Sequence, residues 1–155
     1  MRITEENRPW WTLAGTCMGL FVLMLDSTVV SLALPAIRDD LGASATELQW
    51  VVNGYLLTLA VLVVTAGRLG DMFGRRRVFL VGLVTFAAGL LLAALAPAIE
   101  VLIAARFVQG AGAAGMLTLS LAIVSSVFSD ADRPRAMGIW AGISSMALAA
   151  GPLIG

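Results

Sequence analysis

The chain alternates long apolar segments with short polar ones. Five segments reach or approach the length of about 20 apolar residues that a helix needs to cross a bilayer. Strands of membrane barrels would instead alternate apolar and polar positions over about ten residues. The pattern therefore predicts an all-α membrane protein with about five transmembrane helices, at about residues 10–34, 48–66, 78–96, 99–127 and 137–155.

The arginines between these segments predict the orientation of the bundle. With a cytoplasmic tail at residues 1–9, eight arginines fall on the cytoplasmic side, while the outer connections hold only Arg38. This distribution follows the positive-inside rule. We therefore expect a multi-pass protein of the cell membrane, with residues 67–77 and 128–136 also cytoplasmic. Residues 10–155 are expected to form one transmembrane bundle that is incomplete at its C-terminus, because the last apolar segment is still running at the final residue.

Composition excludes several classes of function. Hydrophobic residues make up 59% of the chain and charged residues 13%, and the formal net charge is zero, so nothing favours nucleic-acid binding. The absence of His excludes His-based zinc sites and Ser-His or Cys-His nucleophile pairs in this segment. We therefore expect no enzyme activity, no metal site and no cofactor, and we expect the single cysteine, Cys17, to serve packing.

Two ionisable residues inside apolar segments are the first candidates for function. Asp26 lies nine residues before Pro35, and Arg106 lies nine residues after Pro97 on a segment of opposite direction. Both charges would then lie about 13 Å from the outer helix ends, where they can face a common cavity and compensate each other. Gln109 follows on the same helical face as Arg106. Charges in membranes usually mark ion or substrate pathways. A structural ion pair, or two side chains reaching toward the headgroups, is the alternative.

The polar connection at residues 67–77 is the second candidate. Its glycines allow a tight turn and close helix approach, and its arginines favour the cytoplasm. Asp71 is placed either to cap the following helix or to pair with Arg75. A simple positive-inside loop with turn glycines is the alternative. The residues singled out here are Gly67, Asp71, Gly74, Arg75 and Arg76.

Small residues mark the fourth and fifth apolar segments. In the fourth, they form faces that can bring two helix backbones into contact, at Gly110, Gly112, Ala114 and Gly115. In the fifth, a proline removes one backbone hydrogen bond and lies between glycines spaced four apart, which predicts a bent and closely packed helix. The residues of this second pattern are Gly138, Gly142, Gly151, Pro152 and Gly155.

Together these motifs resemble the major facilitator superfamily and, more narrowly, its drug/proton antiporters with fourteen spans. Residues 67–77 are similar to the signature G-x-L-x-D-x-x-G-R-R between spans two and three, with Met72 in place of a basic residue. Residues 25–35 (LDSTVVSLALP) resemble the first-span motif. Residues 106–112 (RFVQGAG) resemble the fourth-span motif, whose Arg the family associates with proton coupling. The antiporter motif of the fifth span is matched by Gly138, Gly151, Pro152 and Gly155, with Ala147 in place of one glycine.

The resemblance implies a transporter of two six-helix bundles plus two further spans, which rock about a midplane site. It implies efflux of amphipathic organic compounds driven by proton influx. Asp26 would carry the proton with Arg106 and Gln109 beside it, while Asp71 and Arg75 would belong to a cytoplasmic gate. The implied partners are the lipid bilayer, a small-molecule substrate, protons and the missing C-terminal bundle of the same transporter.

Three alternatives stand beside this interpretation. The first is a facilitator or symporter of a small solute within the same superfamily, with twelve spans or fourteen. The second is an intramembrane protease, which the absence of His excludes in this segment. The third is a truncated chain that transports nothing by itself, because the substrate site of this fold lies between two bundles.

Overall fold

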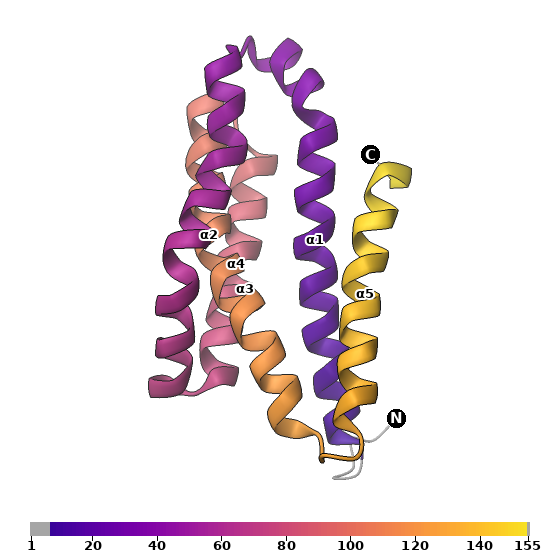
Figure 1. The fold of residues 1–155 in the computed structure, drawn as a ribbon. Helices are drawn as coiled ribbons and strands as arrows, with labels where there is room; N and C mark the ends of the chain where they lie inside the picture. The colour runs from indigo at the N-terminus through magenta and orange to yellow at the C-terminus, as the bar shows by residue number, and fades with distance from the viewer. Residues whose placement is uncertain (1–6, 155) are drawn as a thin grey trace.

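The computed structural model describes residues 7–154, and of residues 148, 150 and 151–154 it describes only the backbone. The described chain forms five helices that run up and down beside one another and contains no strand (Figure 1). Four of them, α1 to α4, are long and apolar enough to cross a membrane, and α5 is not among these four. The predicted all-α membrane fold is confirmed. The helices are α1 (Arg8–Leu41), α2 (Ala45–Phe73), α3 (Arg75–Ala94), α4 (Ile99–Val127) and α5 (Arg133–Ile154).

Helix α1 is longer than its sequence predicts. We expected the first helix to end near residue 34, before Pro35, but α1 continues through this proline to Leu41. A proline removes one backbone hydrogen bond, a loss that membrane helices tolerate where neighbouring groups compensate. The helix ends where Gly42 adopts a left-handed backbone with φ of 62° and its N–H donates to the Arg38 carbonyl. Consequently, residues 42–44 alone connect α1 to α2.

The start of α2 is fixed by a capping box. The Glu47 N–H donates to the hydroxyl of Ser44 at 3.3 Å, and the Ser44 N–H donates to the Glu47 carboxylate at 2.8 Å. Two of the backbone donors that have no partner within the helix are thereby satisfied. This sharp start places the next apolar positions of α2, including Val51 and Tyr55, on the face that packs against α4.

The centre of the bundle is α4, which packs mainly against α2 and α3. A Cβ atom added to Gly112 would lie 2.5 Å from the Gly82 carbonyl oxygen of α3, so the two backbones touch at this point. The predicted small-residue face of the fourth segment is therefore confirmed as a helix contact. In contrast, α1 packs mainly against α5. Figure 1 shows these two helices beside each other, with the lower half of α4 reaching their lower ends.

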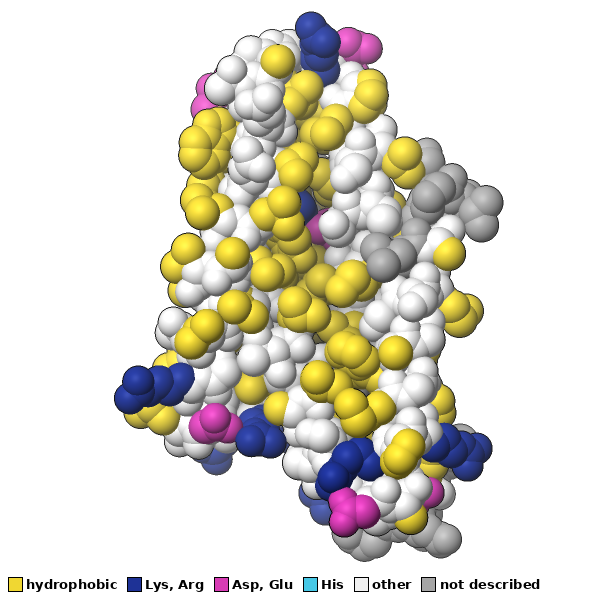
Figure 2. Space-filling model, viewed as in Figure 1, with side chains coloured by type: hydrophobic (Ala, Val, Ile, Leu, Met, Phe, Trp, Pro, Cys, Tyr) yellow, Lys and Arg dark blue, Asp and Glu magenta, His cyan; other side chains and the backbone are white. Residues whose placement is uncertain are grey.

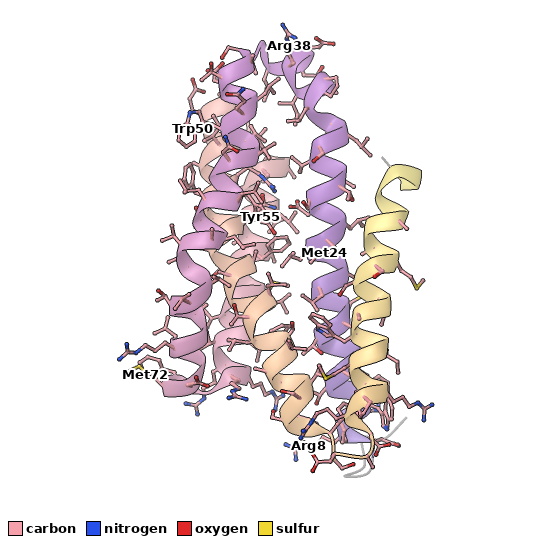
Figure 3. All side chains as sticks on the ribbon, viewed as in Figure 1. Arg8, Met24, Arg38, Trp50, Tyr55 and Met72 are labelled. Carbon is pink, nitrogen blue, oxygen red and sulfur yellow. The ribbon has the colours of Figure 1, made fainter. Side chains whose placement is uncertain are left out.

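The outer surface of the bundle is largely apolar, and its charges gather at the ends. Figure 2 shows basic side chains mainly at the lower end, where α2 meets α3 and α4 meets α5, while Figure 3 places Arg38 at the opposite end. Val64 and Leu95, each 78% exposed, are among the apolar side chains that face outward. Cys17 is buried in an apolar cluster with Leu13 and Val124, which confirms its packing role.

Candidate functional site

The two charges inside the bundle form an ion pair. An Arg106 Nη1 group on α4 donates to Asp26 Oδ2 on α1 at 2.7 Å, and the two side chains are only 3% and 7% exposed. The expected pairing is confirmed, but the expected depth is not. Because α1 extends to Leu41, Asp26 lies about 22 Å from that helix end, whereas Arg106 lies about 10 Å from Ile99. The pair forms because α1 projects beyond α4 at this end.

Gln109 closes the pair into a three-residue cluster. Its Nε2 donates to Asp26 Oδ1 at 3.1 Å, and its Oε1 accepts from Arg106 Nη1 at 2.9 Å. The side chain is fully buried and lies against Gly89 of α3, where a Cβ atom would come within 2.5 Å of the Gln109 Cγ. Both oxygens of the carboxylate therefore have a donor, as buried polar groups require. The predicted association of Gln109 with Arg106 is confirmed.

Helix α2 contributes two contacts to Arg106 that the sequence analysis did not anticipate. The Nε group of Arg106 donates to the Val51 carbonyl at 3.0 Å, and its Cζ lies 4.5 Å from the centroid of the Tyr55 ring. Tyr55 is the only tyrosine of the chain and lies within an apolar segment. This position is the feature of the sequence that could have indicated its part in the site. Figure 2 shows a basic and an acidic side chain in the hollow between α1 and α2, at the depth of this cluster.

This arrangement has one clear chemical capacity. The carboxylate of Asp26 can take up a proton, which would cancel its charge and remove the electrostatic attraction to Arg106. A buried ion pair contributes little stability compared with apolar packing, since removing two charges from water is costly. Groups of at least three metal-ligating side chains are absent from the part of the chain that the structure describes.

The predicted loop at residues 67–77 is largely helical. Gly67 and Asp71 belong to the last turns of α2, and only Gly74, with φ of 97°, stands between α2 and α3. Sequence alone does not distinguish a glycine that makes a turn from one that makes room. Gly67 makes room, because its Cβ position lies 3.3 Å from Thr118 of α4. Of the two roles predicted for these glycines, Gly74 therefore makes the turn and Gly67 allows the close helix approach.

Asp71 pairs with Arg75, which is one of the two alternatives predicted for it. Arg75 donates from Nε and Nη2 to Asp71 Oδ1 at 3.2 and 3.1 Å, and its Nη1 donates to the Ala122 carbonyl of α4 at 3.3 Å. Asp71 does not cap α3, whose N-cap residue Gly74 has no side-chain hydrogen bond. The pair is exposed, and Arg76 is exposed on the next position of α3.

A cavity of about 780 Å³ lies near these arginines. Its lining includes Arg8, Trp11, Arg75, Arg76 and Phe79, and it includes no residue of the buried cluster. It opens between the first turns of α1 and α3 and the last turn of α4. The intramembrane cluster is therefore the candidate functional site, and the cavity is a separate feature.

The fifth-segment motif lies on α5, and the structure describes the surroundings of only part of it. Gly138 has no neighbouring atom within 4 Å of its Cβ position, whereas the close packing was expected at Gly151 and Gly155, whose surroundings lie outside the described residues. Gly151 and Pro152 lie within the helical backbone of α5, and Gly155 lies outside the described residues.

The sequence of the chain matches a known family over most of its length. Residues 16–155 match the Major Facilitator Superfamily. The chain belongs to this superfamily. Its buried cluster and the segment around Asp71 therefore lie within a major facilitator bundle, as the motifs predicted. Because this family consists of transporters, membership also argues against the intramembrane protease alternative.

Several curated relatives are similar to this major facilitator chain over a limited part of their length. The tetracenomycin C resistance and export protein of Streptomyces glaucescens is 43% identical over 150 residues, which are 97% of this chain and 28% of the relative. The multidrug resistance protein Stp of Mycobacterium tuberculosis is 43% identical over 145 residues, 93% of this chain and 27% of that protein. The multidrug efflux pump LfrA of Mycolicibacterium smegmatis is 40% identical over 150 residues, 96% of this chain and 30% of that pump.

Proposed function

We propose that this chain is the N-terminal part of a proton-driven exporter of amphipathic organic compounds. The observation that carries the proposal is the buried cluster of Asp26, Arg106 and Gln109, an ionisable group at membrane depth that can bind and release a proton. The names of the relatives, which describe tetracenomycin C export and multidrug efflux, support the direction and the class of substrate. The proposal concerns the whole transporter, because the chain spans less than a third of each of these relatives.

In the proposed cycle, the protonation state of Asp26 controls its attachment to Arg106. The charged carboxylate holds α1 against α4 through the 2.7 Å contact. The neutral acid loses the ionic attraction, and α1 is then free to shift with respect to α4. Access of Asp26 to water from one side and then the other would couple these two states to substrate movement between the bundles.

The finer assignments belong to the same proposal. We place the chain in the cell membrane with the N-terminus in the cytoplasm, on the strength of the arginine distribution. We assign the Asp71–Arg75 pair to a cytoplasmic gate and the protein to the fourteen-span antiporter branch, on the strength of the motif resemblance. A cysteine at position 72, in a Cys17→Ser background, should react with an impermeant reagent only from the cytoplasmic side. Labelling of this cysteine in intact cells would contradict the orientation.

Replacement of the carboxylate tests the coupling role directly. In the complete transporter, reconstituted in lipid vesicles, Asp26→Asn should abolish substrate-dependent proton flux and leave substrate binding measurable. The matched control is Asp130→Asn, since Asp130 is a highly exposed carboxylate that pairs with Arg133 three residues away. This control should behave as the wild type. Undiminished proton flux in Asp26→Asn would exclude a coupling role for Asp26, and absence of such flux in the wild type would exclude a proton-driven exporter.

A further inference from the structure

Arg106 is held by α2 independently of Asp26. The Val51 carbonyl accepts from its Nε group at 3.0 Å, and the Tyr55 ring covers its guanidinium with 4.5 Å between Cζ and the ring centroid. Val51 and Tyr55 are four residues apart, so they lie on the same face of α2 one turn from each other. Both side chains are buried. Figure 3 shows Tyr55 in the middle of the bundle, on the side of α2 that faces α1.

Two helices, α1 and α2, contact α4 at the cluster, and the contact of α2 is the tighter one. A Cβ atom on Gly110, next to Gln109, would lie 2.5 Å from the Tyr55 carbonyl oxygen, so the α4 backbone touches α2 at Tyr55 itself. One turn away, the Cβ position of Gly54 lies 3.1 Å from the Phe107 ring. Helix α1 packs mainly against α5 and less closely against α4 than α2 does, although its Gly19 lies against Met116 of α4. The helices that hold Arg106 are therefore packed more tightly against each other than against the helix that carries Asp26.

We propose that Tyr55 is a positioning residue, which keeps the Arg106 guanidinium in one place while the charge of Asp26 changes. An aromatic face attracts a cation more strongly where water is excluded, as it is around this 2% exposed arginine. When Asp26 becomes neutral, the ring of Tyr55 and the carbonyl of Val51 still hold Arg106. The carboxylate, not the arginine, is then the partner that leaves and returns. In its meaning for transport, this inference rests on the proton-driven cycle proposed above.

The ionisable groups that meet at this point are few. Asp26 comes from α1, Arg106 from α4 and Tyr55 from α2. The other charged side chains of the described residues lie toward the helix ends or in the connections between helices, and Cys17 is buried in the apolar cluster near the start of α1. Among the described residues, Asp26 is therefore the group on which a change in the pH dependence of transport after substitution of Tyr55 would report.

A substitution series at Tyr55 in the complete transporter separates the ring from the hydroxyl. Tyr55→Phe keeps the aromatic face, and Tyr55→Leu removes it. Tyr55→Met also removes it but fills the space with a flexible side chain, and it replaces Tyr55→Leu if that variant does not fold. The first readout is the Nε–H resonance of Arg106 in protein labelled with [¹⁵N]arginine and held in lipid nanodiscs, assigned by its loss in Arg106→Lys. The spectra are recorded in an Asp26→Asn background, which imitates the neutral acid.

We expect a sharp Arg106 resonance in Asp26→Asn alone and with Tyr55→Phe, and a shifted and broadened one with Tyr55→Leu or Tyr55→Met. The second readout is substrate-driven proton flux with Asp26 intact. Loss of the ring should lower kcat about tenfold and displace the pH profile, with KM unchanged and with Tyr55→Phe at the wild-type rate.

An Arg106 resonance that stays sharp in Tyr55→Leu and Tyr55→Met would overturn the inference, whatever the transport activity. If the resonance responds as expected but the wild type carries no substrate-driven proton flux, the positioning role stands and the proposed function fails. Normal proton flux with an unchanged pH profile in both variants would leave the proposed function intact and remove Tyr55 from its mechanism.

Discussion

Two parts of this bundle are built in different ways. In the trio of α2, α3 and α4, backbones touch at glycines, and 61% of the most apolar stretch of α4 is buried, compared with 11% of that of α1. The pair of α1 and α5 is joined by apolar side chains such as Leu13 and Ile143, and Gly15 and Gly142 face open space, whereas Gly19 of α1 lies against Met116 of α4. The charged cluster lies where these two parts meet. A tight part that carries Arg106 and a looser part that carries Asp26 form a suitable arrangement for a contact that opens and closes.

The strongest test of this comparison removes the charge from the tight part. Arg106→Ala should lower the free energy of unfolding by about 3–5 kcal/mol, because Asp26 then remains buried without its cation. The double variant Asp26→Asn with Arg106→Gln should recover most of this loss, because no unpaired charge remains. Denaturant unfolding of the chain in detergent micelles measures both. If Arg106→Ala and the double variant were equally stable, the charges of Asp26 and Arg106 would not compensate each other.

Alanine in place of glycine should have opposite effects in the two parts. Gly112→Ala should destabilise the chain by about 1–3 kcal/mol, since the new Cβ would meet the Gly82 carbonyl oxygen at 2.5 Å and backbone cannot yield easily. Gly142→Ala meets nothing within 4 Å and should stabilise α5 by up to about 1 kcal/mol through better helix propensity. Thermal unfolding of both variants gives the comparison. A loss of similar size at both positions would show that α5 is packed as tightly as α4.

The helix starts of the two parts also differ. Ser44→Ala should cost about 1 kcal/mol, because it removes the hydroxyl that accepts the Glu47 N–H at the start of α2. Asn7→Ala is the matched control at the start of α1, where the Asn7 side chain makes no capping hydrogen bond. Amide hydrogen exchange should then accelerate in the first turn of α2 and stay unchanged in that of α1. Faster exchange in both turns would contradict the difference.

The smallest effect is expected at the exposed ion pair. In the Asp71–Arg75 pair, the carboxylate is 66% exposed and the arginine 44%, so Asp71→Asn should change the free energy of unfolding by less than about 0.5 kcal/mol. A role in gating would appear as lost transport in the complete protein at unchanged stability. A destabilisation as large as that of Arg106→Ala would show that this pair holds the bundle together.

Much of the fold follows from the apolar pattern, and the pairing of Asp26 with Arg106 follows from their place on antiparallel segments. The helix ends were harder to predict from the sequence, because Pro35 suggests a helix end in a soluble protein but lies inside α1 here. The sequence predicted a tight turn and a close helix approach for the glycines of residues 67–77 without assigning the two roles, and Gly67 has the second of them, beside Thr118. The contact between Tyr55 and Arg106 depends on which face of α2 meets α4, and this rotation is set by packing at Gly54 and Gly110 rather than by either segment alone.

The hydrogen bond from Arg106 to the Val51 carbonyl has a consequence for genetics. The acceptor belongs to the main chain, so any amino acid at position 51 retains it. A mutational scan would score this position by side-chain volume alone, and the anchoring role of α2 would escape notice. Chemical synthesis can test this hydrogen bond. An α-hydroxy acid in place of Val52 turns the Val51 carbonyl into an ester carbonyl, which is a weaker acceptor. A main-chain acceptor of this kind can therefore be retained in evolution without a conserved amino acid at its position.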